Sequence, residues 1–274
     1  MTTGATEEIL RGERFAFGKN WSRFLSVLTE ARIRDAELSL RSMLEVDDLR
    51  GKSFLDVGSG SGLFSLAARR LGARVSSFDY DPQSVMCARE LRRRYFPEDV
   101  DWHVEEGSVL NADYMAAKGQ FDVVYSWGVL HHTGNMWQAL DNVSLPVARG
   151  GQLFIAIYND QGARSIWWRR VKEVYCSGIL GKALVCGTFI PVFVGGGAAR
   201  DVLRGRNPLG RYLRPTTRGM SAFYDWFDWL GGLPFEVAPP EMIVRFYRKR
   251  GFALYNLITV GAGLGNNQYV FTKA

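Results

Sequence analysis

The chain is poor in cysteine and histidine, and neither residue type forms a cluster of the kind that binds a metal ion. Its three cysteines are Cys87, Cys176 and Cys186, and their wide spacing fits neither a zinc site nor a disulfide framework. We therefore expect a cytoplasmic protein without a metal site. The first residues include Glu7 and Glu8 and have no apolar run like that of a secretory signal peptide, so no such signal is expected.

The chain also lacks an uninterrupted apolar run long enough for a membrane-spanning helix, which needs about 20 residues. Residues 183–199 are uncharged, but this stretch is shorter and contains Pro191 and three consecutive glycines. We therefore expect it to be broken internally and not to span a membrane. A cap packed on the domain is the preferred interpretation, and an apolar patch with basic flanks at a membrane surface is the alternative.

Positive charge is concentrated in one segment. Residues 161–220 contain eleven Lys and Arg and two acids, so this segment carries +9 whereas the whole chain carries +6. Its basic residues alternate with apolar runs and form no polar stripe, so no nucleic-acid partner is expected. An anionic small molecule or an anionic lipid surface explains the charge equally well. Residues 166–206 are the part in which peripheral membrane contact would occur.

One glycine-rich stretch organises the remainder. Residues 54–57 predict a short buried strand, and the spacing of residues 63–71 predicts a helix. Between them, Gly58, Gly60 and Gly62 permit a tight turn and a close approach of the backbone to a ligand. A strand, a glycine-rich turn and a helix form a nucleotide-type site, because the N–H groups at the start of the helix face the ligand.

A carboxylate follows at the distance that such a site requires. Residues 73–79 predict a second strand, which ends on Asp79, 21 residues beyond Gly58. In doubly wound folds a carboxylate at this place accepts hydrogen bonds from ribose hydroxyls. A helix N-cap is the alternative role for Asp79, and it is the preferred role for Asp81, because Pro82 suits the first helical turn.

Further strands alternate with helices and indicate an α/β fold. Strands are expected at 100–105, 121–126, 150–158, 252–260 and 268–272, and helices at 33–44, 82–95, 166–175 and 240–250. This order predicts a Rossmann-like, doubly wound, seven-stranded sheet that is mostly parallel, with an antiparallel C-terminal strand. We expect an N-terminal helical lid (1–50), a core (51–159 and 239–274) and an inserted basic, aromatic cap (160–238).

Together, these stretches resemble the class I S-adenosylmethionine-dependent methyltransferases, in the small-molecule or ubiquinone-biosynthesis branch. Residues 55–62 resemble the family's first motif, 78–82 its second, 121–132 its fourth strand and active-site turn, and 149–155 its fifth strand. A dinucleotide-binding dehydrogenase is the nearest rival, but it would carry G-x-G-x-x-G and continue with parallel strands. The resemblance implies an enzyme that uses S-adenosyl-L-methionine.

The resemblance also implies the residues that bind this cofactor. Asp56 and the glycine turn would hold its amino-acid end, Asp79 its ribose, and Tyr80 would pack on adenine. Ser108 stands where the family often has an acid, so the adenine contact departs from the pattern. Residues 15–21 either staple the chain to the domain or form a lid. The cofactor residues are Asp56, Gly58, Ser59, Gly60, Gly62, Asp79, Tyr80, Ser108, Val109, Ser126, Phe17 and Trp21.

Two adjacent histidines follow the fourth strand, beside the expected methyl position. His131 or His132 is the expected general base, with His131 preferred because it comes first. The alternative is that one orders the turn and the other lines the pocket. Tyr158 and Asn159 are expected to line the acceptor pocket, whereas Asn266 and Asn267 are expected to shape a hairpin.

The acceptor residues within the cap are less defined by the sequence. Asp225 and Asp228, with Trp226, are expected at the substrate, where the acids would act as a base or pair with a cationic amine. Alternatively, they form a solvated helix face or pair with arginines of the cap.

The expected reaction is methyl transfer to a hydroxyl oxygen of a small, anionic or apolar molecule by in-line displacement. The alternatives are a nitrogen acceptor, a lipid or quinone-like acceptor at a membrane, and, less favoured, RNA, protein or a non-catalytic cofactor-binding role. The sequence leaves the acceptor and the oligomeric state open.

Overall fold

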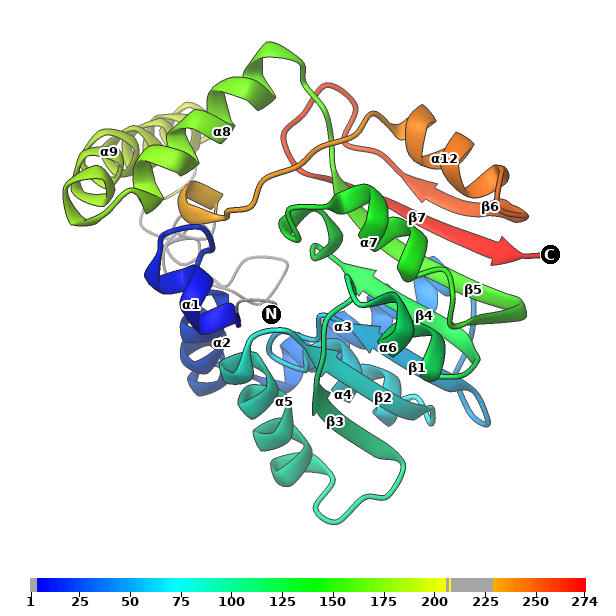
Figure 1. Cartoon of the computed structure of the whole chain (residues 1–274). Coiled ribbons are helices and arrows are strands. Elements are labelled where there is room, and N and C mark those ends of the chain that lie inside the picture. The colour runs from blue at the N-terminus through cyan, green and yellow to red at the C-terminus, as the bar shows by residue number, and fades with distance from the viewer. Residues whose placement is uncertain (1–3, 206, 208–228) are drawn as a thin grey trace.

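The structure, a computed structural model, describes residues 4–205, 207 and 229–274. It is built on one seven-stranded sheet in the order β3-β2-β1-β4-β5-β7-β6 (Figure 1). The strands are β1 (Ser53–Val57), β2 (Arg74–Asp79), β3 (Trp102–Glu106), β4 (Phe121–Trp127), β5 (Val147–Tyr158), β6 (Phe252–Ile258) and β7 (Asn266–Lys273). Strands β1 to β5 pair in parallel, and β7 is antiparallel to both β5 and β6. The predicted fold class is therefore confirmed.

Helices cover both faces of the sheet (Figure 1). One face packs against α3 (Glu30–Leu44), α4 (Leu63–Arg70) and α5 (Pro82–Tyr95) through a core that includes Ile33, Leu66 and Val85. The opposite face packs against α6 (Ala112–Ala117), α7 (Met136–Asn142) and α12 (Pro240–Arg248) through a second core. The near-continuous apolar runs of β1 and β4 follow from burial on both faces.

The strand order reverses between β1 and β4, and this reversal positions the site. Chain segments leave β1 and β4 toward opposite faces of the sheet, so their carboxyl ends flank a crevice. The glycine turn follows β1, and the short 3-10 helix η1 (Leu130–His132) follows β4. Asp81 caps α5 by accepting a hydrogen bond from the Gln83 N–H at 2.9 Å, which confirms its predicted N-cap role.

Two N-terminal helices precede α3 and approach the carboxyl ends of the strands. These are α1 (Ala5–Leu10) and α2 (Phe17–Ser26). The Gly18 N–H donates to Asp81 at 3.0 Å, and the Ser22 hydroxyl lies 3.4 Å from the Cys87 sulfur, so α2 is fixed to the start of α5.

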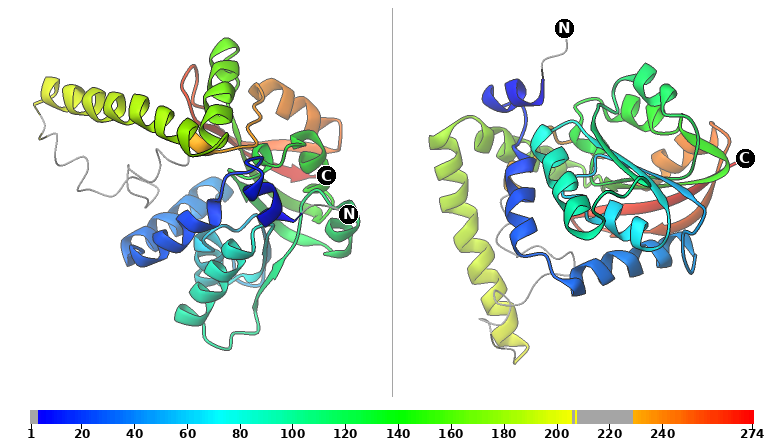
Figure 2. Two further views of the ribbon diagram at one scale, coloured as in Figure 1. Left: turned by 60° about the vertical axis from the view of Figure 1, so that its left-hand side comes forward. Right: turned by 90° about the horizontal axis from the view of Figure 1, so that it is seen from below.

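The helices α8 (Ala163–Cys176) and α9 (Ile179–Leu203) follow β5 and project to one side of the sheet (Figure 2). The expectation that residues 183–199 are broken internally is wrong, because α9 is a continuous helix of 25 residues that contains Pro191. A proline removes one helical hydrogen bond and bends a helix without always ending it. Among the described residues, α9 is the one helix long and apolar enough to cross a membrane by length and composition.

Candidate active site

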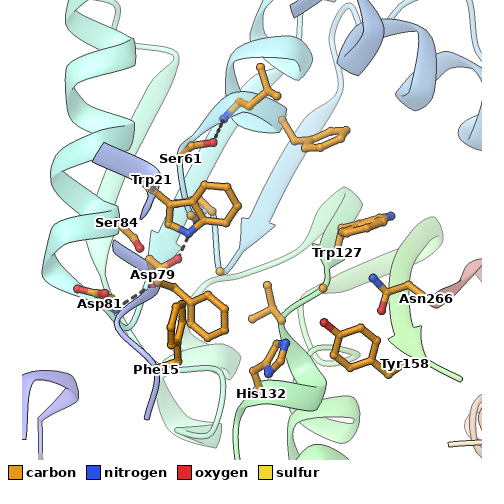
Figure 3. A pocket seen from close by; sticks show the side chains of 18 of the residues that line it. Phe15, Trp21, Ser61, Asp79, Asp81, Ser84, Trp127, His132, Tyr158 and Asn266 are labelled. Atoms are coloured by element: carbon orange, nitrogen blue, oxygen red, sulfur yellow. Dashed lines mark hydrogen bonds between the residues drawn. The ribbon is translucent and has the colours of Figure 1, made fainter. Parts of the chain in front are cut away.

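A large cleft opens at the carboxyl ends of β1, β2 and β4. Its volume is about 1460 Å³, which exceeds the ~300–1,000 Å³ of a typical small-ligand pocket. Residues of the glycine turn and Asp79 line one end, and aromatic side chains such as Trp127 and Tyr158 line the other (Figure 3). The cleft therefore has room for two ligands side by side, one at each end.

The glycine turn brings backbone N–H groups against a carboxylate. The Gly60 N–H donates to Asp79 Oδ2 at 2.8 Å, and the Asp81 N–H donates to Asp79 Oδ1 at 2.9 Å. Gly60 has a positive φ of 53°, and an added Cβ would lie 3.0 Å from the indole of Trp21. A larger residue at position 60 would be strained by this backbone angle, and its Cβ would press closely on the Trp21 indole in the wall of the cleft.

Burial raises the pKa of two carboxyl groups in this end of the cleft. Desolvation raises the pKa of Asp56 to about 7, although a 2.6 Å hydrogen bond from the Ser65 hydroxyl opposes the rise. Desolvation likewise raises the pKa of Asp79 to about 6, against the opposing effect of the two backbone hydrogen bonds. Two desolvated carboxyl groups beside backbone N–H groups favour a ligand that carries donors and positive charge.

The N-terminal segment forms one wall of the cleft. Phe15, Phe17 and Trp21 all line it (Figure 3 labels Phe15 and Trp21). Arg14 donates to the backbone carbonyl of His132 at 3.0 Å and its guanidinium lies 5.0 Å from the ring centre of Tyr80. The segment therefore lines the cleft, as expected of a lid, and it also anchors the chain to the domain through Arg14.

The two adjacent histidines have different environments. His131 is fully buried and is not among the residues that line the cleft, whereas His132 lines it (Figure 3). The preference for His131 as a base in contact with the acceptor is therefore wrong, because its ring lies behind those of His132 and Tyr158, at 4.4 and 4.0 Å between centres. The first histidine after the strand is turned into the protein.

The tautomer of His132 follows from its partner. Its Nδ1 lies 2.6 Å from the carbonyl oxygen of Pro234. Because a carbonyl only accepts, Nδ1 carries the proton and Nε2 carries the lone pair of the neutral ring. Burial lowers the pKa of His132 to about 3, more than the Pro234 hydrogen bond raises it, so the ring is neutral at physiological pH.

The segment that contains Pro234 is tied to the end of the sheet where the cleft opens. The Glu236 N–H donates to the His131 carbonyl at 3.0 Å, and the Ala238 N–H donates to the Tyr158 carbonyl at 3.1 Å. The Glu236 carboxylate accepts from the Met136 N–H at 3.0 Å and so caps α7. Residues 233–238 therefore fix the turn that holds His132.

Comparison of the sequence with known proteins finds methyltransferase relatives for the part of the chain that contains the glycine turn and the two histidines. Residues 55–155 match the family described as "Methyltransferase domain". A tRNA U34 carboxymethyltransferase from Ectopseudomonas mendocina is 36% identical over 111 residues, which are 39% of this chain and 33% of that protein. A ubiquinone biosynthesis O-methyltransferase from Xanthomonas oryzae is 34% identical over 112 residues, 41% of this chain and 45% of that protein. The chain thus spans a third to just under half of the length of these relatives.

Solved structures share the fold across nearly the whole chain. The magnesium protoporphyrin IX methyltransferase from Synechocystis PCC 6803 with bound SAH has a TM-score of 0.56 and 14% identity, covering 97% of this chain and 99% of that one. The 1,6-didemethyltoxoflavin-N1-methyltransferase from Burkholderia thailandensis has a TM-score of 0.51 and 16% identity, covering 100% and 92%. The chain carries a class I S-adenosylmethionine-dependent methyltransferase domain.

Most of the predicted cofactor residues of this methyltransferase domain line the cleft. They are Asp56, Gly58, Ser59, Gly60, Asp79, Tyr80, Ser108, Val109, Phe17 and Trp21. The Ser108 hydroxyl accepts from the Leu110 N–H at 3.3 Å, so it also shapes its own loop. The Tyr80 hydroxyl donates to Glu8 at 3.1 Å, which ties the adenine end of the predicted site to α1.

Three predicted site residues of the methyltransferase domain do not line the cleft. Ser126 is fully buried, and its hydroxyl donates to the Val57 carbonyl at 3.0 Å, so it bridges β4 and β1. Gly62 is turned away, and an added Cβ would lie 2.8 Å from Ala88 Cα. The Asn159 amide donates to the Gly261 carbonyl at 2.9 Å and accepts from Asn267 at 3.0 Å. None of the three lies at the cleft as predicted, because the side chains of Ser126 and Asn159 bond between elements and the Gly62 backbone packs closely against Ala88 of α5.

Several lining residues were not predicted. Asn266 lines the cleft, as does Gln268, whose Oε1 accepts from the Trp127 indole N–H at 3.0 Å (Figure 3). Both come from β7, which reaches the cleft because it pairs antiparallel with β5. Their alternation along β7 is the sequence signal that could have indicated them. Asp225, Trp226 and Asp228 lie outside the described residues.

Proposed function

We propose that the protein transfers a methyl group from S-adenosyl-L-methionine to a hydroxyl oxygen of a small, largely apolar acceptor. The observation that carries the proposal is one continuous cleft, with a carboxylate-and-glycine cradle at one end and an aromatic chamber with the His132 imidazole at the other. The match to a methyltransferase domain and the relative named as an O-methyltransferase support the same activity for the matched part of the chain, which is 41% of it in the case of that relative.

The residues present fit the methyl donor. Asp79 offers a carboxylate to ribose hydroxyls, and its buried site suits a hydrogen-bonded ligand. Gly58 and Gly60 have positive φ angles of 78° and 53°, which glycine adopts readily, so the backbone can turn close to the donor, and Asp56 supplies negative charge near the amino-acid end. When bound, the donor supplies an electrophilic methyl group on a sulfonium. The aromatic wall from α2 excludes water from that end of the cleft.

The low pKa of His132 supports an oxygen acceptor over a nitrogen acceptor. An alkylated hydroxyl becomes a very acidic oxonium, so its proton passes to Nε2 even though the pKa of His132 is only about 3. An alkylated amine keeps a proton with a pKa of about 10, which a ring of this kind cannot take up. His132 therefore accepts the proton late, while Pro234 holds its other nitrogen in place.

The size and lining of the chamber support an apolar acceptor. Besides the residues named above, Trp168, Phe193 and Trp229 line it. An acceptor at a lipid surface is the second form of this proposal, and the position of α9 on the cleft favours it.

Titration calorimetry with the donor and its demethylated product tests the proposal. We expect both to bind, and we expect Asp79→Asn to weaken binding by about 10- to 100-fold, as for loss of hydrogen bonds to a charged group. Asp113→Asn, at an exposed aspartate of α6, is the matched control and should bind as the wild type does. Absence of donor binding by the folded wild-type protein would exclude the activity.

A further inference from the structure

Helix α9 exposes apolar side chains along its length. Ile179 is 85% exposed, Leu180 83% and Leu184 66%, and Val192 and Val202 are exposed as well. Water-exposed apolar area of this extent is costly, at roughly 25 cal/mol per Å². Within the described part of the chain, α9 packs mainly against α8 (Figure 2). The helix therefore presents a surface that a partner would cover.

The outward face of α9 carries no charge from end to end. With about 3.6 residues per turn, one stripe of the helix combines positions spaced by three and four. Its members are Leu180, Leu184, Gly187, Pro191, Val194, Ala198 and Val202. All but Ala198 are exposed, and Ala198 is half-buried. Pro191 and Gly187 thus fall on a face that is uniformly apolar or small, whereas Gly196 and Gly197 line the cleft.

The opposite face of α9 is a wall of the cleft. Val192, Phe193 and Arg200 line the same cavity as Asp79 and His132. Lys182 lies on this side too, with its ammonium 5.4 Å from the ring centre of Tyr175. The helix therefore separates the cleft from whatever covers its outer face.

Exposed basic side chains accompany the outer face without lying on it. Lys182 and Arg200 are exposed on the inner side of α9, Arg204 follows the last residue of the helix, and Arg169 and Arg170 are exposed on α8. Residues 161–205 contain seven basic and two acidic side chains. The exposed Trp167 and Ile166 of α8 add apolar surface beside these cations. An apolar outer face with cations on the inner side complements the boundary between anionic headgroups and acyl chains.

We propose that α9 docks this protein on an anionic lipid bilayer, lying in the plane of the interface with its outer face toward the acyl chains. A second copy of the chain is a poorer occupant, because it would bring the same cations together. A spanning orientation is also disfavoured, since it would place the charge of Arg200, and the cleft that Arg200 lines, within the bilayer.

Docking by α9 would place the cleft beside the bilayer. Resting on the function proposed above, this position defines the acceptor class as an amphiphile that enters from the lipid along the inner face of α9. Its polar end would reach His132, and its apolar part would lie against Phe193 and Trp168. The methyl donor would reach its own end of the cleft from water.

Vesicle flotation of the whole chain tests the docking surface. Vesicles of phosphatidylcholine are compared with vesicles of phosphatidylcholine mixed with phosphatidylglycerol. We expect the wild-type protein to float with the mixed vesicles, and the double variant Leu184→Glu, Val194→Glu to lose at least about tenfold in bound fraction. Both positions are exposed, so the fold should survive, which circular dichroism checks.

The matched control is the double variant Leu38→Glu, Val100→Glu, which changes two exposed apolar residues of α3 and the α5–β3 loop by the same charge. It should float as the wild-type protein does. A wild-type protein that stays unbound, or an α9 variant that binds as well as the wild type, overturns the proposal. A dimer that the α9 variant abolishes, without lipid binding, assigns the face to a second copy and overturns it too.

Donor calorimetry without lipid, on the same proteins, separates this result from the proposed function. Flotation needs no methyl donor, so a wild-type protein that binds the donor but does not float contradicts only the docking surface.

Discussion

At the scale of single residues, the two neighbouring histidines of the turn after β4 have different roles. His131 fills the protein behind the cleft, against Tyr158, while His132 faces the cleft and is oriented by the Pro234 carbonyl. A neutral ring with a fixed tautomer accepts a proton only at Nε2. The histidine that lines the cleft is therefore His132, and its partner Pro234 lies about 100 residues further along the chain.

Replacement of His132 by glutamine should lower kcat with little change in donor affinity. We expect a loss of about 10²–10⁴-fold, the usual contribution of general acid–base catalysis. In the wild type, kcat should not fall near the pKa of an ordinary imidazole, because burial lowers the pKa of His132 to about 3. The measurement is the release of demethylated donor over a range of pH, with a hydroxyl acceptor found by screening.

His103→Gln provides the control, since His103 is an exposed residue of β3 that does not line the cleft. Unchanged turnover in the His132 variant, with the donor bound normally, would remove the base from the proposed reaction.

At the scale of elements, α2 connects donor binding to the N-terminal wall. Trp21 packs over Gly60, and the Gly18 N–H bonds to the Asp81 that caps α5. Trp21→Ala should weaken donor binding by about tenfold or more, because an aromatic wall of the site is removed. Calorimetry with the demethylated donor measures the change.

Trp137→Ala offers a comparison at another partly exposed tryptophan, which stacks on Phe246 and does not line the cleft. Equal affinities in the two variants would mean that α2 anchors the chain but does not close the donor site.

The elements also show how far sequence could predict the molecule. The glycine turn, Asp79 and the sheet were predictable, because each has a local signal in the sequence. Closely spaced glycines indicate the turn, an acid at the end of an apolar run indicates Asp79, and the spacing of apolar residues indicates strands and helices. By contrast, Ser126 and Asn159 bond to residues about 70 and 100 positions away, and no local pattern reports such partners. The continuity of α9 was not predicted, because Pro191 and residues 195–197, which are glycines, usually interrupt a helix. In the structure the helix continues through all of them.

At the scale of the whole molecule, a fall in pH changes the contribution of two buried carboxyl groups to stability in one direction and that of a buried histidine in the other. Asp56 and Asp79 have pKa values raised to about 7 and about 6, so between about pH 4 and 7 the native state holds more protons than the unfolded chain. Their contribution to the free energy of unfolding therefore falls as pH rises. His132, with its pKa lowered to about 3, contributes stability that is lost as pH falls from about 6.5.

Bound donor should reverse the pH dependence of stability that comes from Asp56 and Asp79. Ribose hydroxyls and the positive charge of the amino-acid end favour ionised Asp79 and Asp56, so binding lowers both pKa values and releases protons near pH 6–7. We therefore expect the rise in Tm caused by the demethylated donor to be larger at about pH 7.5 than at about pH 5.5. Scanning calorimetry at fixed ligand concentration measures it, and Asp79→Asn should reduce the difference between the two pH values. A rise in Tm that is equal at both, or larger in acid, would mean that the donor does not bind to the ionised carboxylates.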